Sequence, residues 1–365
     1  MSGEPASART MHPTIDAARA NLSDEIWDYI AGAAETETTT RRNRLALDSL
    51  ALAPRILRDV SNVDPSSTLL GYPMRIPVLL APLGALELIT PEGAAAQVRA
   101  AERFGLIASV SSVAEPSLEE VAAAAAGPKI SQLYVRGDGA WVDELVDRVL
   151  AAGYAAIALT VDAAHYGRRE RQLRHGWLPP GHSEAAGALI WQARLTWEGL
   201  DRIRERSGLP LIVKGIQTAQ DAELAVAHGV DAIYVSNHGG RDLDHAPATL
   251  DSLREIVDAV GGSVELIVDG GVMRGTDVVK ALALGANAVG IGRLQALALA
   301  AGGADALVDA LELLELEIRT TMGLVGVTRV AALDASFLRP AAALPAASTL
   351  QSAFPPRTTD WPARS

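Results

Sequence analysis

Short apolar runs alternate with longer amphipathic, alanine-rich stretches along most of this chain, beginning near Ile76. The apolar runs are rich in Val, Ile, Leu and Ala and end in glycine or polar residues, which is typical of buried β-strands, whereas the alanine-rich stretches predict helices. Eight strands are predicted near residues 77–81, 106–110, 129–134, 155–161, 209–214, 231–236, 264–269 and 288–292. Helices are predicted near residues 91–104, 117–126, 140–152, 197–207, 218–228, 249–260, 275–285 and 303–323.

This regular alternation predicts the fold class. Eight successive strand-helix units are typical of an α/β protein with a closed (β/α)8 barrel, the TIM barrel. A doubly wound parallel sheet is the alternative, because it also alternates strands with helices. Ahead of the first unit lies an N-terminal helical segment that starts near Thr14. Within it, Ser23 is expected to cap a helix that begins at Asp24 and ends at Gly32.

The spacing between predicted strands four and five is wider than the others, at about 50 residues. We therefore interpret residues 163–196 as an insertion after strand four that forms an active-site loop. Residues 1–12 and 339–365 are rich in small residues, polar residues and proline, so both are expected to be disordered. Residues 13–338 are expected to form a single barrel domain.

Composition narrows the possible partners. The 365 residues are 49% hydrophobic, which is enough to bury a large core, and they include no cysteine, so disulfides and thiolate metal sites are excluded. A reducing cytoplasm is the expected location. The net charge of -12 argues against a nucleic-acid partner. No signal-peptide pattern and no uncharged apolar run of membrane-spanning length is found, so no membrane partner is expected, and no metal site is predicted.

Polar residues gather at the C-terminal ends of the predicted strands, where TIM barrels hold their active sites. Buried polar groups cost free energy unless they are paired, so packing alone does not favour this accumulation. We therefore expect the active site at this end of the barrel. The residues concerned are Ser111, Ser112, Gln132, Tyr134, Thr160, Asp162, Lys214, Ser236, His238, Asp269 and Arg293.

The segment 235–244 contains the catalytic candidates. His238 and Arg241 leave one turn, and the two glycines between them let the backbone bend without a Cβ penalty. A titratable imidazole beside a fixed cation suits proton abstraction from an anionic substrate. Asp162 ends strand four, near enough across the barrel mouth to pair with His238 and stabilise its imidazolium form.

Two further features indicate an anionic ligand. Asp269-Gly-Gly271 follows strand seven and Gly290-Ile-Gly-Arg293 follows strand eight, where barrels commonly bind phosphate through backbone amides. The chain lacks a P-loop and lacks GxGxxG after its first strand, so an ATP or NAD site has no support. Lys214 has three possible roles: Schiff-base formation, phosphate contact, or stabilisation of negative charge on a cofactor ring.

Five motifs together resemble one known family, in order and in register from about Trp27 to Thr328. They are Leu159-Thr-Val-Asp162, Gly167-Arg-Arg169, Val213-Lys-Gly215, Val235-Ser-Asn-His-Gly-Gly-Arg241 and Val268-Asp-Gly-Gly271. The family is that of the FMN-dependent α-hydroxy acid oxidases and dehydrogenases, whose members act on glycolate, lactate or mandelate. The resemblance implies an FMN-binding barrel that oxidises an L-2-hydroxy acid to the 2-oxo acid and passes electrons to oxygen or another acceptor. It also implies a homo-oligomer, commonly a tetramer.

The resemblance assigns roles residue by residue. His238 matches the catalytic base, and Asp162 matches its partner. Tyr134 matches the tyrosine at the substrate oxygen, and Lys214 matches the lysine beside flavin N1. The residues that match the carboxylate grip are Tyr29, Arg169 and Arg241. Those that match the flavin, ribityl and phosphate contacts are Leu83, Gly84, Ser111, Gln132, Thr160, Ser236, Asp269, Gly270, Gly271, Gly292 and Arg293.

Three positions depart from the usual pattern. Val113 stands where some members have a tryptophan, which predicts room for a medium or bulky, mandelate-like substrate. Met273 stands where arginine is usual, so one flavin or phosphate contact is expected to be either missing or supplied by Arg274. Gly84 stands where simple oxidases tend to have alanine, and this difference bears on how oxygen reaches the reduced flavin.

Several alternatives remain open at this level. In one route His238 takes the hydroxyl proton while the α-hydrogen moves to flavin N5 as hydride, and in the other His238 removes the α-proton and leaves a carbanion. Other enzyme classes also compete: a Schiff-base aldolase using Lys214, or a noncatalytic barrel that binds a phosphate ligand.

Overall fold

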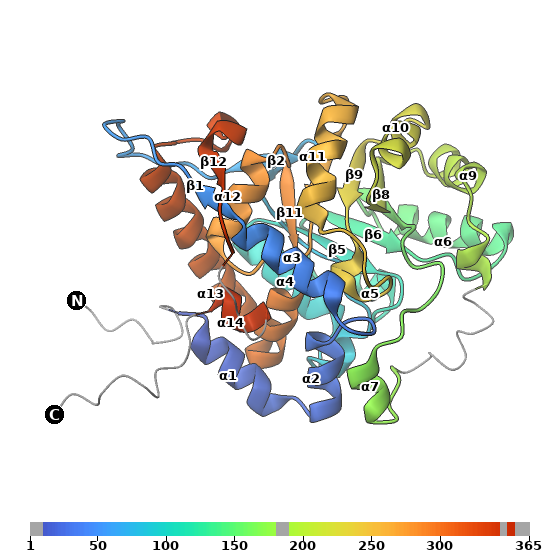
Figure 1. The fold of residues 1–365 in the computed structure, drawn as a ribbon. Helices are drawn as coiled ribbons and strands as arrows, with labels where there is room; N and C mark the ends of the chain where they lie inside the picture. Colours follow the sequence, from blue (N-terminus) through green and yellow to red (C-terminus); the bar gives the residue numbers. More distant parts are fainter. Residues whose placement is uncertain (1–9, 180–189, 344–348, 355–365) are drawn as a thin grey trace.

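A closed barrel of eight parallel strands with helices around it forms the body of the protein (Figure 1). The structure is a computed structural model and describes residues 10–179, 190–343 and 349–354. The strand order is β10-β11-β4-β5-β6-β7-β8-β9. Because β11 pairs with β4, with Val289 opposite Val78, the sheet closes on itself. The TIM-barrel prediction is confirmed, and the doubly wound alternative is wrong.

All eight barrel strands lie close to their predicted positions. Nearly every strand residue is buried, as expected where side chains face either the barrel interior or the surrounding helices. The strands are β4 (Val78–Leu80), β5 (Ile107–Ser111), β6 (Lys129–Leu133), β7 (Ala156–Thr160), β8 (Leu211–Ile216), β9 (Ala232–Val235), β10 (Glu265–Val268) and β11 (Ala288–Ile291).

The helices that cover the barrel also match the prediction, with one exception. They are α4 (Ala94–Phe104), α5 (Leu118–Ala123), α6 (Gly139–Ala151), α9 (Trp197–Ser207), α10 (Ala219–Ala227), α11 (Thr249–Val260), α12 (Gly275–Ala283) and α13 (Arg293–Val325). The exception is α13, which starts directly after β11 instead of near residue 303. Its backbone is non-helical at Gly302 and Gly303, so the predicted start marks an interruption within a longer helix.

The N-terminal segment folds as α1 (His12–Asn21), α2 (Asp24–Ala31) and α3 (Thr38–Asp48). Ser23 caps α2, as predicted, by accepting a hydrogen bond from the Ile26 amide at 3.4 Å. Gly32 ends the same helix. Two small antiparallel pairs lie outside the barrel: β2 (Ser67–Leu69) with β3 (Tyr72–Met74), and β1 (Leu50–Leu52) with β12 (Leu338–Pro340).

Both predicted disordered ends need correction where the structure describes them. Met11 is buried and α1 begins at His12, inside the predicted disordered stretch 1–12. In the tail, β12 extends to Pro340 and α14 (Thr349–Ala353) packs on α3. The reason is that a few apolar side chains, Phe354 among them, are buried against the domain. Residues 1–9, 344–348 and 355–365 lie outside the described residues.

The insertion after the fourth barrel strand lies beside the N-terminal helices. Its helix α7 (Glu170–Arg174) contacts α2, and Figure 1 shows the two at the same edge of the molecule. Residues 180–189 of the insertion lie outside the described residues. Short 3-10 turns complete the fold at η2 (Leu86–Leu88), η3 (His238–Gly240), η4 (Val330–Ala332) and η5 (Ala335–Phe337). Among the described helices, none combines the length and apolarity needed to cross a membrane.

Candidate active site

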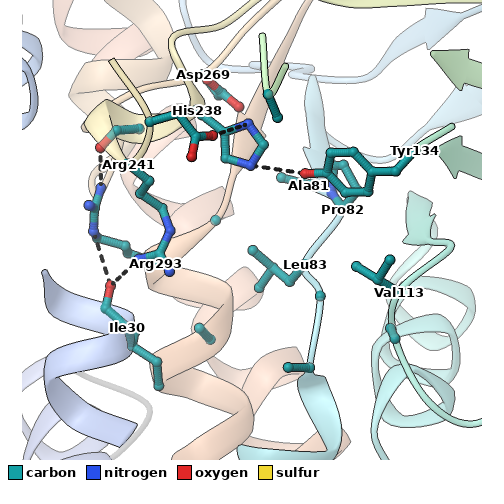
Figure 2. Close-up of a pocket in the computed structure, with 18 of the residues that line it drawn as sticks. Ile30, Ala81, Pro82, Leu83, Val113, Tyr134, His238, Arg241, Asp269 and Arg293 are labelled. Carbon is teal, nitrogen blue, oxygen red and sulfur yellow. Dashed lines mark hydrogen bonds and ion pairs between the residues drawn. The ribbon is translucent and has the colours of Figure 1, made fainter. Parts of the chain in front are cut away.

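A cavity of about 710 Å³ opens at the C-terminal ends of the barrel strands. This volume lies within the range usual for cofactor and substrate sites. The cavity walls come from the strand ends, from the end of α2 and from the insertion, and Figure 2 shows part of the lining. Residues assigned from the sequence that line it are Tyr29, Leu83, Gly84, Val113, Tyr134, Arg169, Lys214, His238, Arg241, Asp269, Gly270, Gly271, Gly292 and Arg293.

His238 lies at the centre of a hydrogen-bonded chain, and Figure 2 shows its ring beside Tyr134. It follows β9 in a turn with positive φ, and its amide donates to Ser236 Oγ at 3.1 Å. Its Nδ1 lies 3.0 Å from Asp162 Oδ1, and its Nε2 lies 3.1 Å from the Tyr134 hydroxyl. An ionised carboxylate only accepts hydrogen bonds, so Nδ1 carries the proton. Nε2 is therefore the basic nitrogen.

The charges around His238 hold its two neighbours in complementary states. Burial raises the pKa of Asp162, but the nearby His238 and Lys214 outweigh it and hold that pKa below its ordinary value. Asp162 is therefore an anion beside Nδ1. Burial also raises the pKa of Tyr134 well above 10, and Asp242 and Asp162 add to the effect. Tyr134 therefore stays a neutral phenol that donates its proton to Nε2.

Lys214 is held inside the barrel mouth. Its side chain is buried, its Nζ donates to Ser236 Oγ at 2.9 Å, and Asp269 Oδ2 lies 3.9 Å away. The ammonium also lies 5.1 Å from the centre of the Tyr234 ring. Ser236 therefore orients both His238 and Lys214, which fixes a cation beside the general base.

The polar groups of this cavity fit FMN. Among the buried oxygens that have no hydrogen-bond partner in the described residues, three belong to residues assigned to the site: Gln132 Oε1, Asp162 Oδ2 and Asp269 Oδ1. Such groups are costly unless a polar ligand or water satisfies them. A Cβ added to Gly292 would meet only Leu83, at 3.8 Å, so this backbone borders open space where a ligand can approach. Ser111, Gln132, Thr160 and Ser236 are buried at the strand ends, beneath the cavity.

Arg241 and Arg293 meet at the end of α2. Arg241 donates to the carbonyl of Tyr29 at 2.7 Å, and Arg293 donates to the carbonyl of Ile30 at 3.2 Å. Figure 2 shows both guanidiniums beside Ile30. Burial, with Arg241 adding repulsion, lowers the pKa of Arg293 to about 9. Two part-buried cations on a helix end with partial negative charge form a site that favours anionic ligands.

Arg169 places the insertion beside Arg241. Its Nε donates to the carbonyl of Arg241 at 3.1 Å, and its Nη1 donates to the Tyr166 hydroxyl at 2.7 Å. Burial opposes the charge, but Tyr166 and Asp242 overcome this effect and raise the pKa of Arg169. Arg169 and Arg241 are therefore neighbouring guanidiniums in the cavity lining, as a carboxylate grip requires.

Arg274 is the assigned residue that the structure places elsewhere. It precedes α12, and its guanidinium pairs with Glu317 of α13 at 2.5 Å and lies over the Phe354 ring. Met273 lines the cavity and Arg274 does not. The expected compensation for Met273 is contradicted, because neighbouring side chains at this helix start point to different sides.

Asp242 is a cavity residue that the sequence reasoning missed. It lines the cavity and contacts both His238 and Arg169. The sequence feature that could have identified Asp242 is a carboxylate four positions after the catalytic histidine. Because the turn between them is irregular, this spacing does not predict where the side chain points. The backbone carbonyls at the end of α2 were also missed, because side-chain patterns do not show them.

The sequence profile of the FMN-dependent dehydrogenase family matches residues 18–340. The chain belongs to this family. It is 41% identical to glycolate oxidase 1 of Oryza sativa subsp. indica, covering 86% of this chain and 91% of that protein. It is 40% identical to an L-lactate oxidase of Nostoc sp., with coverage of 88% and 95%. A solved structure of mandelate oxidase with 3,3-difluoro-2-hydroxy-3-phenylpropionic acid aligns at a TM-score of 0.84 and 40% identity, with coverage of 91% and 98%.

These similarities confirm the family expected from the sequence motifs. They also confirm FMN as the cofactor and FMN-dependent oxidation of 2-hydroxy acids as the class of reaction. The family assignment leaves no support for a Schiff-base aldolase or a noncatalytic phosphate-binding barrel. The contact of Lys214 with Ser236 agrees with a charge-stabilising role beside a cofactor.

Proposed function

We propose that this enzyme oxidises L-2-hydroxy acids with a medium or bulky apolar side chain, mandelate-like acids among them. The observation that carries the proposal is the arrangement of His238. Asp162 holds Nδ1, Nε2 points to Tyr134, and Arg169 and Arg241 line the same cavity. A general base, a hydroxyl donor and a carboxylate grip are the groups that this reaction needs.

Each residue of the site has its own role in the proposed reaction. Arg169 and Arg241 bind the substrate carboxylate with charge-assisted hydrogen bonds, and Tyr29 lies against the Arg241 guanidinium at 4.8 Å. His238 Nε2 accepts the substrate proton, and Asp162 stabilises the resulting imidazolium. The two routes considered above differ in which proton is removed, and both place it on Nε2. FMN, when bound, supplies the two-electron acceptor.

The residues that we propose to hold the flavin are those assigned from the motifs. Lys214, Gln132, Ser111, Thr160 and Ser236 would hold the ring. Lys214 would favour negative charge on it, because an ammonium stabilises an adjacent anion. The backbone and side chains that would hold the ribityl chain and phosphate are Leu83, Gly84, Asp269, Gly270, Gly271, Gly292 and Arg293.

The proposed substrate size is supported by the cavity wall. Val113 and Leu83 line the cavity with apolar surface. The similar mandelate oxidase structure contains a phenyl-bearing 2-hydroxy acid. Oxygen is the proposed electron acceptor, in keeping with the oxidase names of the relatives.

The test is a substrate panel on purified protein. The released cofactor should be FMN, and mandelate or a branched 2-hydroxy acid should exceed glycolate in kcat/KM, with oxygen and with an artificial dye as acceptors. A strong preference for glycolate contradicts the proposed substrate class. Absence of turnover with every 2-hydroxy acid, despite bound FMN, contradicts the function.

We also propose a cytoplasmic homo-oligomer. The lack of cysteine supports a reducing compartment, and family membership supports an oligomer. Light scattering on the purified holoenzyme measures the oligomeric state, and a monomer at micromolar concentration contradicts it.

A further inference from the structure

The Asp242 carboxylate joins three parts of the active site. Its Oδ1 accepts hydrogen bonds from the Gly167 amide at 3.1 Å and from Arg169 Nη2 at 3.3 Å. Its Oδ2 lies 3.4 Å from His238 Nδ1. Only 7% of the side chain is exposed. None of the roles assigned above uses this residue.

His238 Nδ1 therefore faces two carboxylates. Asp162 lies nearer, at 3.0 Å, and Asp242 lies at 3.4 Å. One N–H donates well to a single acceptor, so the nearer Asp162 takes the hydrogen bond and Asp242 acts mainly through its charge. An opposite charge at this distance favours the protonated imidazole. The other titratable or charged groups around His238 are Tyr134 just after β6, Lys214 from β8, Arg169 from the insertion and Arg241 from the same turn.

The Asp242 carboxylate also affects how Arg169 binds the substrate carboxylate. Asp242 partly neutralises Arg169, so a substrate carboxylate must share this guanidinium with a resident anion. The hydrogen bond to Gly167 holds the insertion in place, and the approach is close: a Cβ on Gly167 would lie 2.5 Å from Asp242 Cα. The Asp242 side chain thus contributes negative charge both at the base, His238, and at Arg169 of the carboxylate grip.

We propose that Asp242 is a positioning residue that strengthens His238 as a base and weakens the hold of Arg169 on the carboxylate. This inference rests on the proposed function. Its charge favours proton uptake on Nε2 and at the same time limits how tightly substrate and product bind. Asp242 therefore favours turnover over affinity.

The test is Asp242→Asn in the holoenzyme, because asparagine keeps the size and can still accept from Gly167 and Arg169. We expect kcat to fall by up to about tenfold, because the loss of a nearby opposite charge makes His238 a weaker base. KM, and the Kd of the 2-oxo acid product, should fall severalfold. The acid limb of kcat/KM should move to lower pH. If Asp242 had a purely structural role, Asp242→Asn would raise KM and leave the acid limb of kcat/KM at the wild-type pH. That result overturns the proposal.

The matched control is Asp244→Asn. Asp244 is a buried carboxylate two positions further on, and it accepts from the Thr36 and Thr39 amides without contacting His238 or Arg169. This variant should leave the acid limb where it is in the wild type. An equal shift in both variants overturns the specific role of Asp242. If Asp242→Asn does not fold, Asp242→Gln is neutral, keeps an acceptor and takes the same measurements.

A second measurement separates this proposal from the function itself. In protein labelled with ¹⁵N-histidine and free of substrate, the titration of His238 is assigned by comparison with His238→Ala. Its midpoint should lie at lower pH in Asp242→Asn than in wild type. An unmoved midpoint overturns the role of Asp242, even in an active enzyme. Lack of activity toward all 2-hydroxy acids, with a shifted midpoint, overturns only the proposed function.

Discussion

Arg241 and Arg293 donate hydrogen bonds to the same acceptor, the carbonyl oxygen of Gly32, at 3.2 and 3.0 Å. Two like charges converge on one backbone oxygen at the end of α2, beside the cavity. Neither guanidinium is an ordinary surface cation, because partial burial opposes both charges, Arg169 repels Arg241, and Arg241 repels Arg293. An anion bound between or beside them relieves this cost, so the arrangement favours ligands with phosphate and carboxylate groups.

The first prediction concerns the FMN phosphate. Arg293→Met should weaken FMN binding by about ten to a hundredfold, the loss of one charge-assisted hydrogen-bonding group. The melting temperature of the apoprotein should not fall, because a costly buried charge has been removed. Fluorescence titration of apoprotein with FMN measures the affinity. Arg274→Met is the control, and it should stay within about twofold of wild type because Arg274 pairs with Glu317 outside the cavity. An equal loss in both variants contradicts the placement of the phosphate.

The second prediction concerns the base. His238→Ala should retain FMN but lose about 10²-fold to 10⁴-fold or more in kcat, since a positioned general base contributes this much. Steady-state kinetics with the best substrate of the panel provides the measurement. His228→Ala serves as a control, because His228 also pairs with an aspartate, Asp201, but it follows α10 and does not line the cavity. Near wild-type turnover in His238→Ala excludes His238 as the base.

The third prediction concerns the carboxylate grip. Arg169→Lys keeps the charge but loses the planar fork, so KM should rise about tenfold, corresponding to roughly 1.5 kcal/mol. The loss should be much smaller for the analogous alcohol that lacks a carboxylate, which should be a poor substrate of either protein. If wild type oxidises the alcohol as well as the acid, the grip is assigned wrongly.

The fourth prediction concerns Gly84 and the electron acceptor. We expect Gly84→Ala to raise peroxide release, because a methyl group there changes how oxygen approaches the flavin. A Cβ on Gly84 would lie 2.8 Å from Val113 Cγ2, so the substitution must be compared with Gly84→Ala/Val113→Ala, which removes the contact. The variants are compared by stopped-flow measurement of the reoxidation of reduced flavin, and the peroxide and carbon dioxide produced are assayed alongside. Fast wild-type reoxidation with stoichiometric peroxide, unchanged in both variants, shows that Gly84 does not set the acceptor.

The fifth prediction concerns stability and pH. Burial alone would raise the pKa of Asp244, but hydrogen bonds from Thr36 and Thr39 hold it well below its ordinary value. Because the folded-state pKa is depressed, the stabilisation is complete above the unfolded value near 4 and is lost as the pH falls below it. Asp244→Asn should cost about 2 to 3 kcal/mol at pH 7, and less at pH 3. Thermal unfolding at both pH values is the measurement, and a difference that does not narrow on acidification contradicts it.

The fold and much of the site were predictable because barrel geometry converts position along the chain into position in space. Asp162 and His238 lie far apart in the sequence, but each follows a barrel strand, and the C-terminal ends of those strands share one mouth. The prediction failed where direction depends on irregular backbone. Arg274 is an example, since a one-residue step at the start of α12 turns its side chain toward Glu317. Asp242 was missed for the same reason.

The small sheet of β1 and β12 links distant parts of the sequence. Leu50 pairs with Pro340 and Leu52 with Leu338, so the segment that follows α3 forms a sheet with residues that come after the barrel in the sequence. Tyr29, which lines the cavity, belongs to the same N-terminal region, whose helices also contact α13, η3 and α11. Cutting the chain after Phe337 would leave the eight barrel strands intact but remove the strand that pairs with β1. The minimal catalytic unit of this protein is thus larger than its barrel.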